Sequence, residues 1–373
     1  MKNVAIITYH GAYNYGSVFQ AYATQEALKK LGYDTCIINY RMKEQKRYYS
    51  LYRTSYGMKI FLKDLLQFPI QNKRAYRNQR FEEFISNYLN LSQEVDEPEK
   101  VNEIVNDYQV LLSGSDQIWN KNSNELFNAP DEYMKPYFWA GCKGKKISYA
   151  SSIGNMTLED LETKSDELKG FQHLSSREKI GANIIESIVQ KKVQTVLDPT
   201  FLLTKQEWED RFCSPKKERF VLFYSLNGIK MINEWTKNLE NLSNGLAVVI
   251  KVITPFAYMH SKNKNIINVP DMGPIEFINA IYNAEMIITD SFHGTALSIN
   301  LNKKFFVLCN EGSTEYRKKE LLEKFKLENR IIKNYRELLN RLDEKIDYES
   351  VNYLIEKNRI ESNTYRMLLR TNK

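Results

Sequence analysis

Short apolar runs alternate with helical patterns along most of the chain, and this alternation constrains the fold more than any other feature. Residues 4–9 (Val-Ala-Ile-Ile-Thr-Tyr) have the length and composition of a buried strand. Residues 17–31 then show apolar positions at helical spacing before Gly32, and residues 35–40 form another apolar run. A strand, a helix and a strand in this order predict two parallel strands joined by a right-handed crossover. The sequence therefore predicts an α/β fold.

The same alternation recurs in two series. In the first half, further strands are expected at residues 110–112, 146–150, 173–175 and 193–197. In the second half, strands are expected at 220–225, 246–252, 286–289 and 304–308, with helices at 230–242 and 274–283 and a loop followed by a helix within 290–300. A chain of 373 residues exceeds what one compact core usually takes. We therefore predict two doubly wound, Rossmann-like domains at residues 1–200 and 201–346, and a C-terminal helix at 347–373 that returns to the first domain.

A basic, aromatic segment interrupts the first of these domains. Residues 41–80 contain eleven Lys or Arg residues against Glu44 and Asp64, a net charge of +9 in a chain whose total is +7. Such a mixture suits an anionic, partly apolar surface, for example a membrane interface. Solvated helix faces over an aromatic inner side are an equally good interpretation. No nucleic-acid-binding motif accompanies the segment, so we expect no nucleic-acid partner and describe residues 41–90 as an insertion.

Targeting and metal-binding signals are not found in the sequence. The apolar run at residues 4–7 is too short for the core of a signal peptide, and no stretch is long enough to span a bilayer. We therefore expect a cytoplasmic protein. The four cysteines lie far apart without paired spacing, which argues against a zinc knuckle or a disulfide framework. We expect no metal.

The most informative short segment is residues 287–295, where an apolar strand ends and a helix begins. Its loop residues should point into the ligand crevice of a parallel sheet, and the N–H groups of a helix start favour anions. We therefore place Ser291, His293, Gly294 and Thr295 beside a phosphate or carboxylate pocket. On this geometry alone, His293 is either catalytic or a hydrogen-bonded residue that ties the loop together.

Other polar groups also follow predicted strands. Ser115 and Asp116 offer a hydroxyl and a carboxylate to sugar hydroxyls, although Asp116 could equally cap the next turn. Arg177 precedes a helix, and Arg317 and Lys318 follow the strand at 304–308. Guanidinium groups suit bidentate capture of carboxylate or phosphate, whereas an isolated basic residue is ordinarily a solvated surface charge.

Five segments together resemble the polysaccharide pyruvyl transferase family, and they span nearly the whole chain. They are residues 11–20, 113–120, 176–178, 198–200 and 289–295. The most specific are Gly-Ser-Asp-Gln-Ile-Trp at 114–119 and Asp-Ser-Phe-His-Gly-Thr at 290–295. The resemblance implies a two-domain fold like that of the GT-B glycosyltransferases, phosphoenolpyruvate as donor, no cofactor or metal, and transfer of the pyruvyl unit as a ketal onto two sugar hydroxyls.

The resemblance also implies roles for individual residues. His293 matches the family's histidine, which would protonate the enol carbon of the donor. Arg177 matches the arginine that binds the donor's carboxylate or phosphate, and a later basic residue of the family falls at Arg317 or Lys318. The residues that would face the sugar acceptor are Asn14, Tyr15, Ser115 and Asp116. We expect His293 and Arg177 to meet in one pocket.

In capsule and exopolysaccharide biosynthesis the acceptor would be a lipid-linked sugar at the inner face of the cell membrane. The basic insertion would then make a peripheral membrane contact. Two alternatives stay open, because a fold by itself does not decide function. One is a GT-B-like glycosyltransferase that uses a nucleotide sugar. The other is a non-catalytic sugar-binding protein of the same fold.

Overall fold

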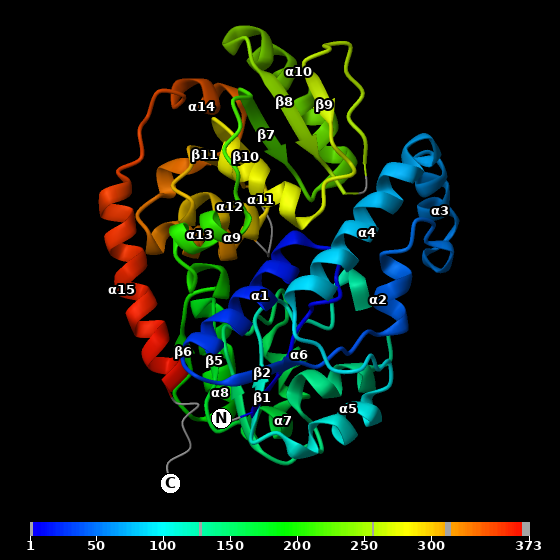
Figure 1. Cartoon of the computed structure of the whole chain (residues 1–373), viewed down its shortest axis with the longest axis vertical. Coiled ribbons are helices and arrows are strands. Elements are labelled where there is room, and N and C mark those ends of the chain that lie inside the picture. Colours follow the sequence, from blue (N-terminus) through cyan, green and yellow to red (C-terminus); the bar gives the residue numbers. More distant parts are fainter. Residues whose placement is uncertain (1–2, 127–128, 256, 310–314, 368–373) are drawn as a thin grey trace. The chain divides into compact units, whose positions relative to one another are not determined.

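The computed structural model describes residues 3–126, 129–255, 257–309 and 315–367 (Figure 1). The chain divides into two compact units. Unit 1 comprises Met1–Ser50, Ile85–Leu203 and Glu356–Lys373, and unit 2 comprises Leu51–Phe84 and Thr204–Ile355. Each unit is built around its own parallel sheet.

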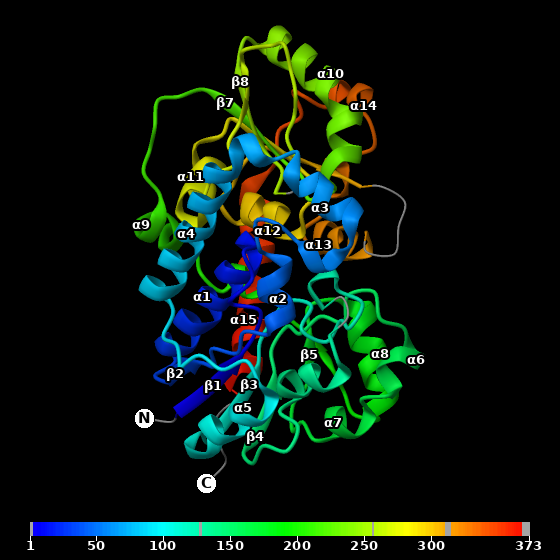
Figure 2. The same ribbon diagram turned by 90° about the vertical axis from the view of Figure 1, so that its right-hand side faces the viewer.

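The main sheet of unit 1 has four parallel strands in the order β2-β1-β3-β4 (Figure 2). Their bounds are β1 (Asn3–Ile7), β2 (Asp34–Ile37), β3 (Val110–Ser113) and β4 (Lys145–Ser148). β1 is buried from Val4 to Ile7, because an inner strand of a parallel sheet is covered on both faces. From β1 the chain first adds β2 on one side and then β3 on the other. The strand order therefore reverses between β1 and β3, where such sheets bind ligands beyond the carboxyl ends of their strands.

Helices and two very short strands complete unit 1. The helices that lie wholly within it are α1 (Tyr15–Lys30), α2 (Lys43–Tyr48), α5 (Pro98–Ile104), α6 (Leu158–Glu162), α7 (Ser165–Lys169) and α8 (Lys179–Val189). The short strands β5 (Ser175–Ser176) and β6 (Gln194–Thr195) pair in parallel. β6 lies in the predicted strand at 193–197, whereas β5 overlaps the predicted strand at 173–175 only at Ser175, and each has only two residues.

The C-terminal helix α15 (Tyr348–Met367), red in Figure 1, joins unit 1 through its second half. There, Ser362 Oγ accepts a hydrogen bond from Leu197 N at 3.0 Å, and Tyr365 OH donates to the Ser148 carbonyl at 2.9 Å. Because Leu197 and Ser148 belong to the first half of the chain, the predicted return of the C-terminal helix to the first domain is confirmed.

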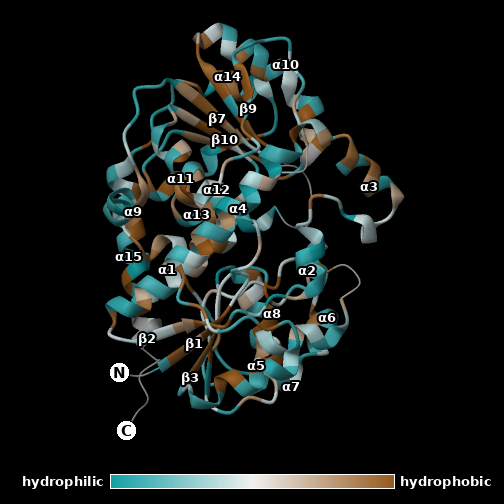
Figure 3. Ribbon diagram, turned by 45° about the vertical axis from the view of Figure 1, so that its right-hand side comes forward, coloured by the Kyte–Doolittle hydropathy of each residue, from teal (hydrophilic) through white to brown (hydrophobic). Residues whose placement is uncertain are grey.

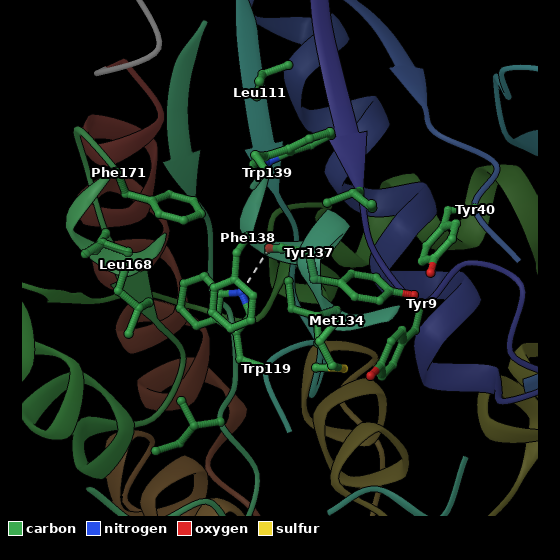
Figure 4. Packing of buried hydrophobic residues seen from close by; sticks show 14 of the residues in the cluster. Tyr9, Tyr40, Leu111, Trp119, Met134, Tyr137, Phe138, Trp139, Leu168 and Phe171 are labelled. Atoms are coloured by element: carbon green, nitrogen blue, oxygen red, sulfur yellow. Dashed lines mark hydrogen bonds between the residues drawn. The ribbon is translucent and has the colours of Figure 1, made fainter. Parts of the chain in front are cut away.

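Aromatic packing in the core of unit 1 explains one of the motifs. Trp119 is 1% exposed and stacks on Phe138, with ring centroids 5.4 Å apart (Figure 4). Its indole N–H donates to the Tyr137 carbonyl at 3.0 Å. The tryptophan of the Gly-Ser-Asp-Gln-Ile-Trp segment therefore fixes the loop after β3 by packing.

Unit 2 contains a six-stranded parallel sheet in the order β12-β11-β10-β7-β8-β9. The strands are β7 (Phe220–Tyr224), β8 (Val249–Ile253), β9 (Ile266–Asn268), β10 (Met286–Thr289), β11 (Phe305–Leu308) and β12 (Ile331–Ile332). The helices after residue 204 are α9 (Lys205–Phe212), α10 (Gly228–Leu246), α11 (Pro274–Asn283), α12 (Phe292–Asn300), α13 (Tyr316–Lys324) and α14 (Tyr335–Asn340). The short strands β9 and β12 were not predicted, because two or three residues carry too little pattern. The strand order reverses between β7 and β10, which gives unit 2 its own switch point.

Part of the basic insertion groups with unit 2 instead of the first domain. Residues Leu51–Phe84 include α3 (Met58–Leu65) and most of α4 (Gln71–Tyr88). Arg80 donates to the Asp271 carbonyl at 2.9 Å, and Phe84 packs against Phe212 with ring centroids 5.7 Å apart. Both partners are distant in sequence, so no local pattern indicates this grouping. Among the described residues, no helix combines the length and apolar character that crossing a bilayer requires.

Candidate active site

The switch point of unit 2 is tied together by Asp290, the first residue after β10. Its carboxylate accepts hydrogen bonds from Ser225 Oγ at 2.6 Å, from Leu226 N at 2.7 Å and from the Asn227 side-chain amide at 2.8 Å. These donors all follow β7. Asp290 therefore joins the ends of the two strands between which the order reverses, and it fixes the path of the chain that leads to His293.

Ser291 starts helix α12 as its N-cap. Its Oγ accepts from Gly294 N at 3.2 Å, and Thr295 Oγ1 donates to the Ser291 carbonyl at 2.9 Å. A Cβ added to Gly294 would lie 2.8 Å from Thr289 Oγ1, closer than real Cβ atoms come, and 3.0 Å from Tyr224 Cδ1, tighter than most real Cβ contacts. Glycine is needed here because the helix begins directly against β7 and β10. The predicted donor-binding residues Ser291, Gly294 and Thr295 therefore form the helix cap.

His293 is the second residue of α12 and is 7% exposed. Its ring meets that of Phe292 edge-on, with centroids 5.2 Å apart at 89°. The first N–H groups of a helix have no partner within the helix and carry partial positive charge. An imidazole in this first turn lies where an anion would be stabilised, and it can exchange a proton with that anion.

Lys318, on α13, holds the backbone of the same loop by hydrogen bonds. Its Nζ donates to the carbonyls of Asp290 at 2.9 Å and of Leu308 at 2.8 Å, and it pairs with Glu315 at 2.8 Å. The side chain is 5% exposed. The structure thus places the predicted donor contact Lys318 under the backbone of the histidine loop, with its charge compensated. Arg317, the other predicted contact, is half-buried at the start of the same helix.

At the switch point of unit 1, Arg177 is surrounded by carboxylates. Its Nε donates to Glu178 at 2.6 Å, its Nη1 donates to Asp198 at 2.9 Å, and its Nη2 lies 3.8 Å from Asp116. Burial alone would lower the pKa of Arg177, but Glu178, Asp198 and Asp116 raise it far above its ordinary value. The guanidinium is therefore permanently charged, and it compensates part of a buried cluster of three carboxylates.

Asp116 is held in a left-handed conformation, with φ at 74°. Its Oδ1 accepts from Gln117 N at 2.9 Å. Its Oδ2 accepts from Ser17 Oγ at 2.5 Å. Aspartate tolerates this backbone region better than most residues, and such strained positions concentrate at functional sites.

The other predicted acceptor residues lie in unit 1 near the same strand ends. Ser115 is fully buried, and its Oγ donates to Asp198 at 3.2 Å. Asn14 caps helix α1 by accepting from Gly16 N at 3.0 Å, and Tyr15 follows it at 1% exposure. Only Asn14 of these three is half-exposed.

Sequence reasoning missed Glu125 and did not assign partners to Arg177. Burial raises the pKa of Glu125 to about 7. Hydrogen bonds from Tyr49 OH at 2.5 Å and from Gln45 at 2.9 Å lower this pKa, but their effect is smaller than that of burial. No motif surrounds Glu125.

The partners of Arg177, Glu178 and Asp198, do lie in the segments at 176–178 and 198–200, so the motifs contain the residues of this ion-pair cluster. His293 belongs to unit 2 and Arg177 to unit 1, and their meeting in one pocket stays a prediction.

A family model described as polysaccharide pyruvyl transferase matches residues 14–312, more than half of the chain. No curated protein matches the sequence. Several solved structures are similar across nearly the whole chain. The UDP-bound MnaA protein of S. aureus has a TM-score of 0.54 and 12% identity, with 100% of this chain and 99% of that chain covered. The UDP-GlcNAc 2-epimerase of Methanocaldococcus jannaschii has a TM-score of 0.52 and 12% identity, with coverage of 95% and 92%.

A third similar structure is the UDP-GlcNAc 2-epimerase of Neisseria meningitidis, with a TM-score of 0.51 and 10% identity. The match covers 100% of this chain and 95% of that chain. At these identities the likeness concerns the fold alone. It confirms the predicted pair of Rossmann-like domains of the GT-B kind.

Proposed function

Because this chain belongs to the polysaccharide pyruvyl transferase family, we propose that it moves the pyruvyl unit of phosphoenolpyruvate onto a sugar of a lipid-linked polysaccharide precursor. The product is a ketal that bridges two hydroxyls of that sugar. The observation that carries the proposal is the extent of the family match, residues 14–312. It includes the loop after β3 and the loop after β10, which lie at the two switch points.

The proposed reaction needs one acid and two hydroxyl nucleophiles. A proton adds to the methylene carbon of the donor, and the first sugar hydroxyl attacks the neighbouring carbon. The second hydroxyl then attacks the same carbon, the bond to phosphate breaks, and inorganic phosphate leaves. One donor and one diol thus give one ketal and one phosphate, without any oxidation.

His293 is the residue that we assign to the proton transfer. After giving its proton to the donor, the neutral imidazole can accept a proton from an attacking hydroxyl, so the histidine is regenerated in each cycle. The first turn of α12 would stabilise the donor's negative charge through its N–H groups. Asp290 and Lys318 act as positioning residues, since both hold the main chain that leads into this turn.

Arg177 is proposed as the donor's second contact, on condition that one of its present carboxylate partners gives way. The donor's carboxylate or phosphate would have to replace a present partner, and Asp116 at 3.8 Å is the one held most weakly. Displaced from Arg177, Asp116 would be available to an acceptor hydroxyl, alongside Asn14, Tyr15 and Ser115. Donor binding and acceptor activation would then be coupled through one guanidinium.

The test is incubation of the purified protein with phosphoenolpyruvate and a panel of lipid-linked and free sugars, followed by mass measurement and phosphate release. We expect one acceptor to gain a pyruvyl ketal with one phosphate released per transfer. His293→Gln should lower the rate by about 10²- to 10⁴-fold, whereas His260→Gln, at an exposed position of the same unit, should leave it unchanged.

Two results would point to other functions. Transfer from a nucleotide sugar, with phosphoenolpyruvate inert, would indicate a glycosyltransferase. Sugar binding without turnover of either donor would indicate a non-catalytic binding protein, and the His293→Gln protein would then bind as well as the native one.

A further inference from the structure

Helix α3 of unit 2 presents its leucines to solvent. Met58 is 71% exposed, Leu62 50% and Leu66 82%. Leu65 and Phe68 are 47% and 56% exposed and lie next to them. We call these five residues the apolar face of α3, although Leu66 and Phe68 directly follow the helix. In Figure 3 this helix is coloured largely hydrophobic and lies at the margin of unit 2, beyond α4. A continuous apolar surface of this kind usually marks a site of interaction.

The one residue of α3 that is fully buried is charged, whereas an ordinary surface helix buries apolar residues. Asp64 is fully buried, and its carboxylate accepts three hydrogen bonds from Arg53, from the backbone N at 3.0 Å, from Nε at 2.9 Å and from Nη2 at 2.6 Å. α3 is therefore attached to the segment that contains Arg53 by a buried bidentate ion pair. The inner side of α3 thus holds this ion pair together with the half-buried Ile60 and Phe61, and its leucines face outward.

The exposed charges of residues 51–81, the segment that carries the apolar face, have one sign. Asp64 is the only carboxylate among residues 51–81, and Arg53 compensates it. The exposed charged residues of this stretch are Lys59, Lys63 and Lys73, all positive. Lys59 and Lys63 belong to α3 itself, one position after Met58 and Leu62, so they lie beside the apolar face.

We propose that α3 docks this protein on an anionic lipid surface. The apolar face enters the boundary between headgroups and acyl chains, and the three lysines lie at the level of the lipid phosphates. A second copy of the chain is a poorer partner, because two such faces would bring three lysines against three. The lipid-linked acceptor of the proposed function gives this contact a purpose, but the contact itself does not depend on catalysis.

The test is sedimentation of the whole protein with vesicles. We expect binding to vesicles that contain phosphatidylglycerol, weakening with salt, and at least about 10-fold weaker binding to pure phosphatidylcholine. Leu62→Ser/Leu66→Ser should weaken binding to the anionic vesicles by about 10-fold or more, because two apolar side chains leave the bilayer. Lys59→Glu/Lys63→Glu should do the same through charge.

Matched controls are available in the same unit. Ile229→Ser/Leu339→Ser removes two apolar side chains of 48% and 46% exposure, and Lys230→Glu/Lys237→Glu reverses two exposed charges. Both should bind as the native protein does. Since all substituted positions are exposed, circular dichroism should report native folding throughout.

Three outcomes would overturn the proposal. Unchanged binding of the α3 variants would remove α3 from the contact, and equal binding to neutral vesicles would remove the role of charge. A dimer that dissociates in Leu62→Ser/Leu66→Ser, without vesicle binding by the native protein, would assign the face to a second copy. Because sedimentation needs no donor or acceptor, its failure is distinguishable from failure of the proposed transfer.

Discussion

Replacing Arg177 by Met should destabilise unit 1, since it removes the cation that lies among three buried carboxylates, Glu178, Asp198 and Asp116. The side chains of Arg177 and Glu178 are 2% and 1% exposed, so water cannot substitute for the lost partner. Removing one member of a buried ion pair costs about 3–5 kcal/mol. Domains are stable by only about 5–15 kcal/mol, so this loss takes a large share of the stability of unit 1.

The size of this loss should depend on pH in a defined direction. In Arg177→Met the stranded carboxylates keep the cost of burying negative charge without a cation to offset it, and protonation at acidic pH removes that charge. The difference between the native protein and the variant should therefore shrink from about pH 7 to about pH 5. Arg177→Lys should be intermediate, because an ammonium group cannot bridge two carboxylates as a guanidinium does.

Urea unfolding followed by hydrogen exchange separates the two units. Peptides from β1 and β3 report unit 1, and peptides from β7 and β10 report unit 2. The loss should be confined to unit 1, and Arg219→Met, at an exposed pair with Glu285, should leave both units unchanged. If Arg177→Met unfolds at the same urea concentration as the native protein, the carboxylates do not depend on the guanidinium and this reasoning is refuted.

Three further changes test other parts of the site. Gly294→Ala should cost up to about 2 kcal/mol in urea unfolding, because overlap with Thr289 and Tyr224 (about 1–3 kcal/mol) matches or exceeds the gain of about 1 kcal/mol in helix propensity, and a stabilised variant would contradict this. The native protein should lose about 3 kcal/mol of stability as pH rises from 4.5, the ordinary carboxyl pKa, to about 7, the pKa of Glu125 in the folded protein, because the folded protein favours the protonated acid. Glu125→Gln should abolish this loss, and parallel stability curves of the two proteins against pH would contradict the prediction. Lys318→Met should cost about 2–4 kcal/mol, because two buried carbonyls and Glu315 lose their donor, and transfer activity should fall with it; an unchanged unfolding midpoint would exclude the anchoring role.

Local patterns in the sequence were sufficient to predict the longer strands and helices of both sheets. The predicted strand at residues 286–289 and the predicted helix at 274–283 coincide with β10 and α11. Both were predictable because an apolar run and a helical spacing of apolar residues are patterns of neighbouring residues. The same holds for the start of α12, where Ser291 caps the helix with its own neighbours. The position of His293 at a strand-to-helix junction followed from these patterns.

Only the tertiary structure decided which charged groups pair. Asp116, Arg177 and Asp198 come from three separate loops, and their ion pairs exist because the strand ends of unit 1 converge. Lys318 reaches the Asp290 carbonyl for the same reason in unit 2, and Arg53 holds Asp64 inside. A sequence records that a residue is charged, whereas burial and the distance to a partner set what that charge does, and both arise only when distant segments pack together.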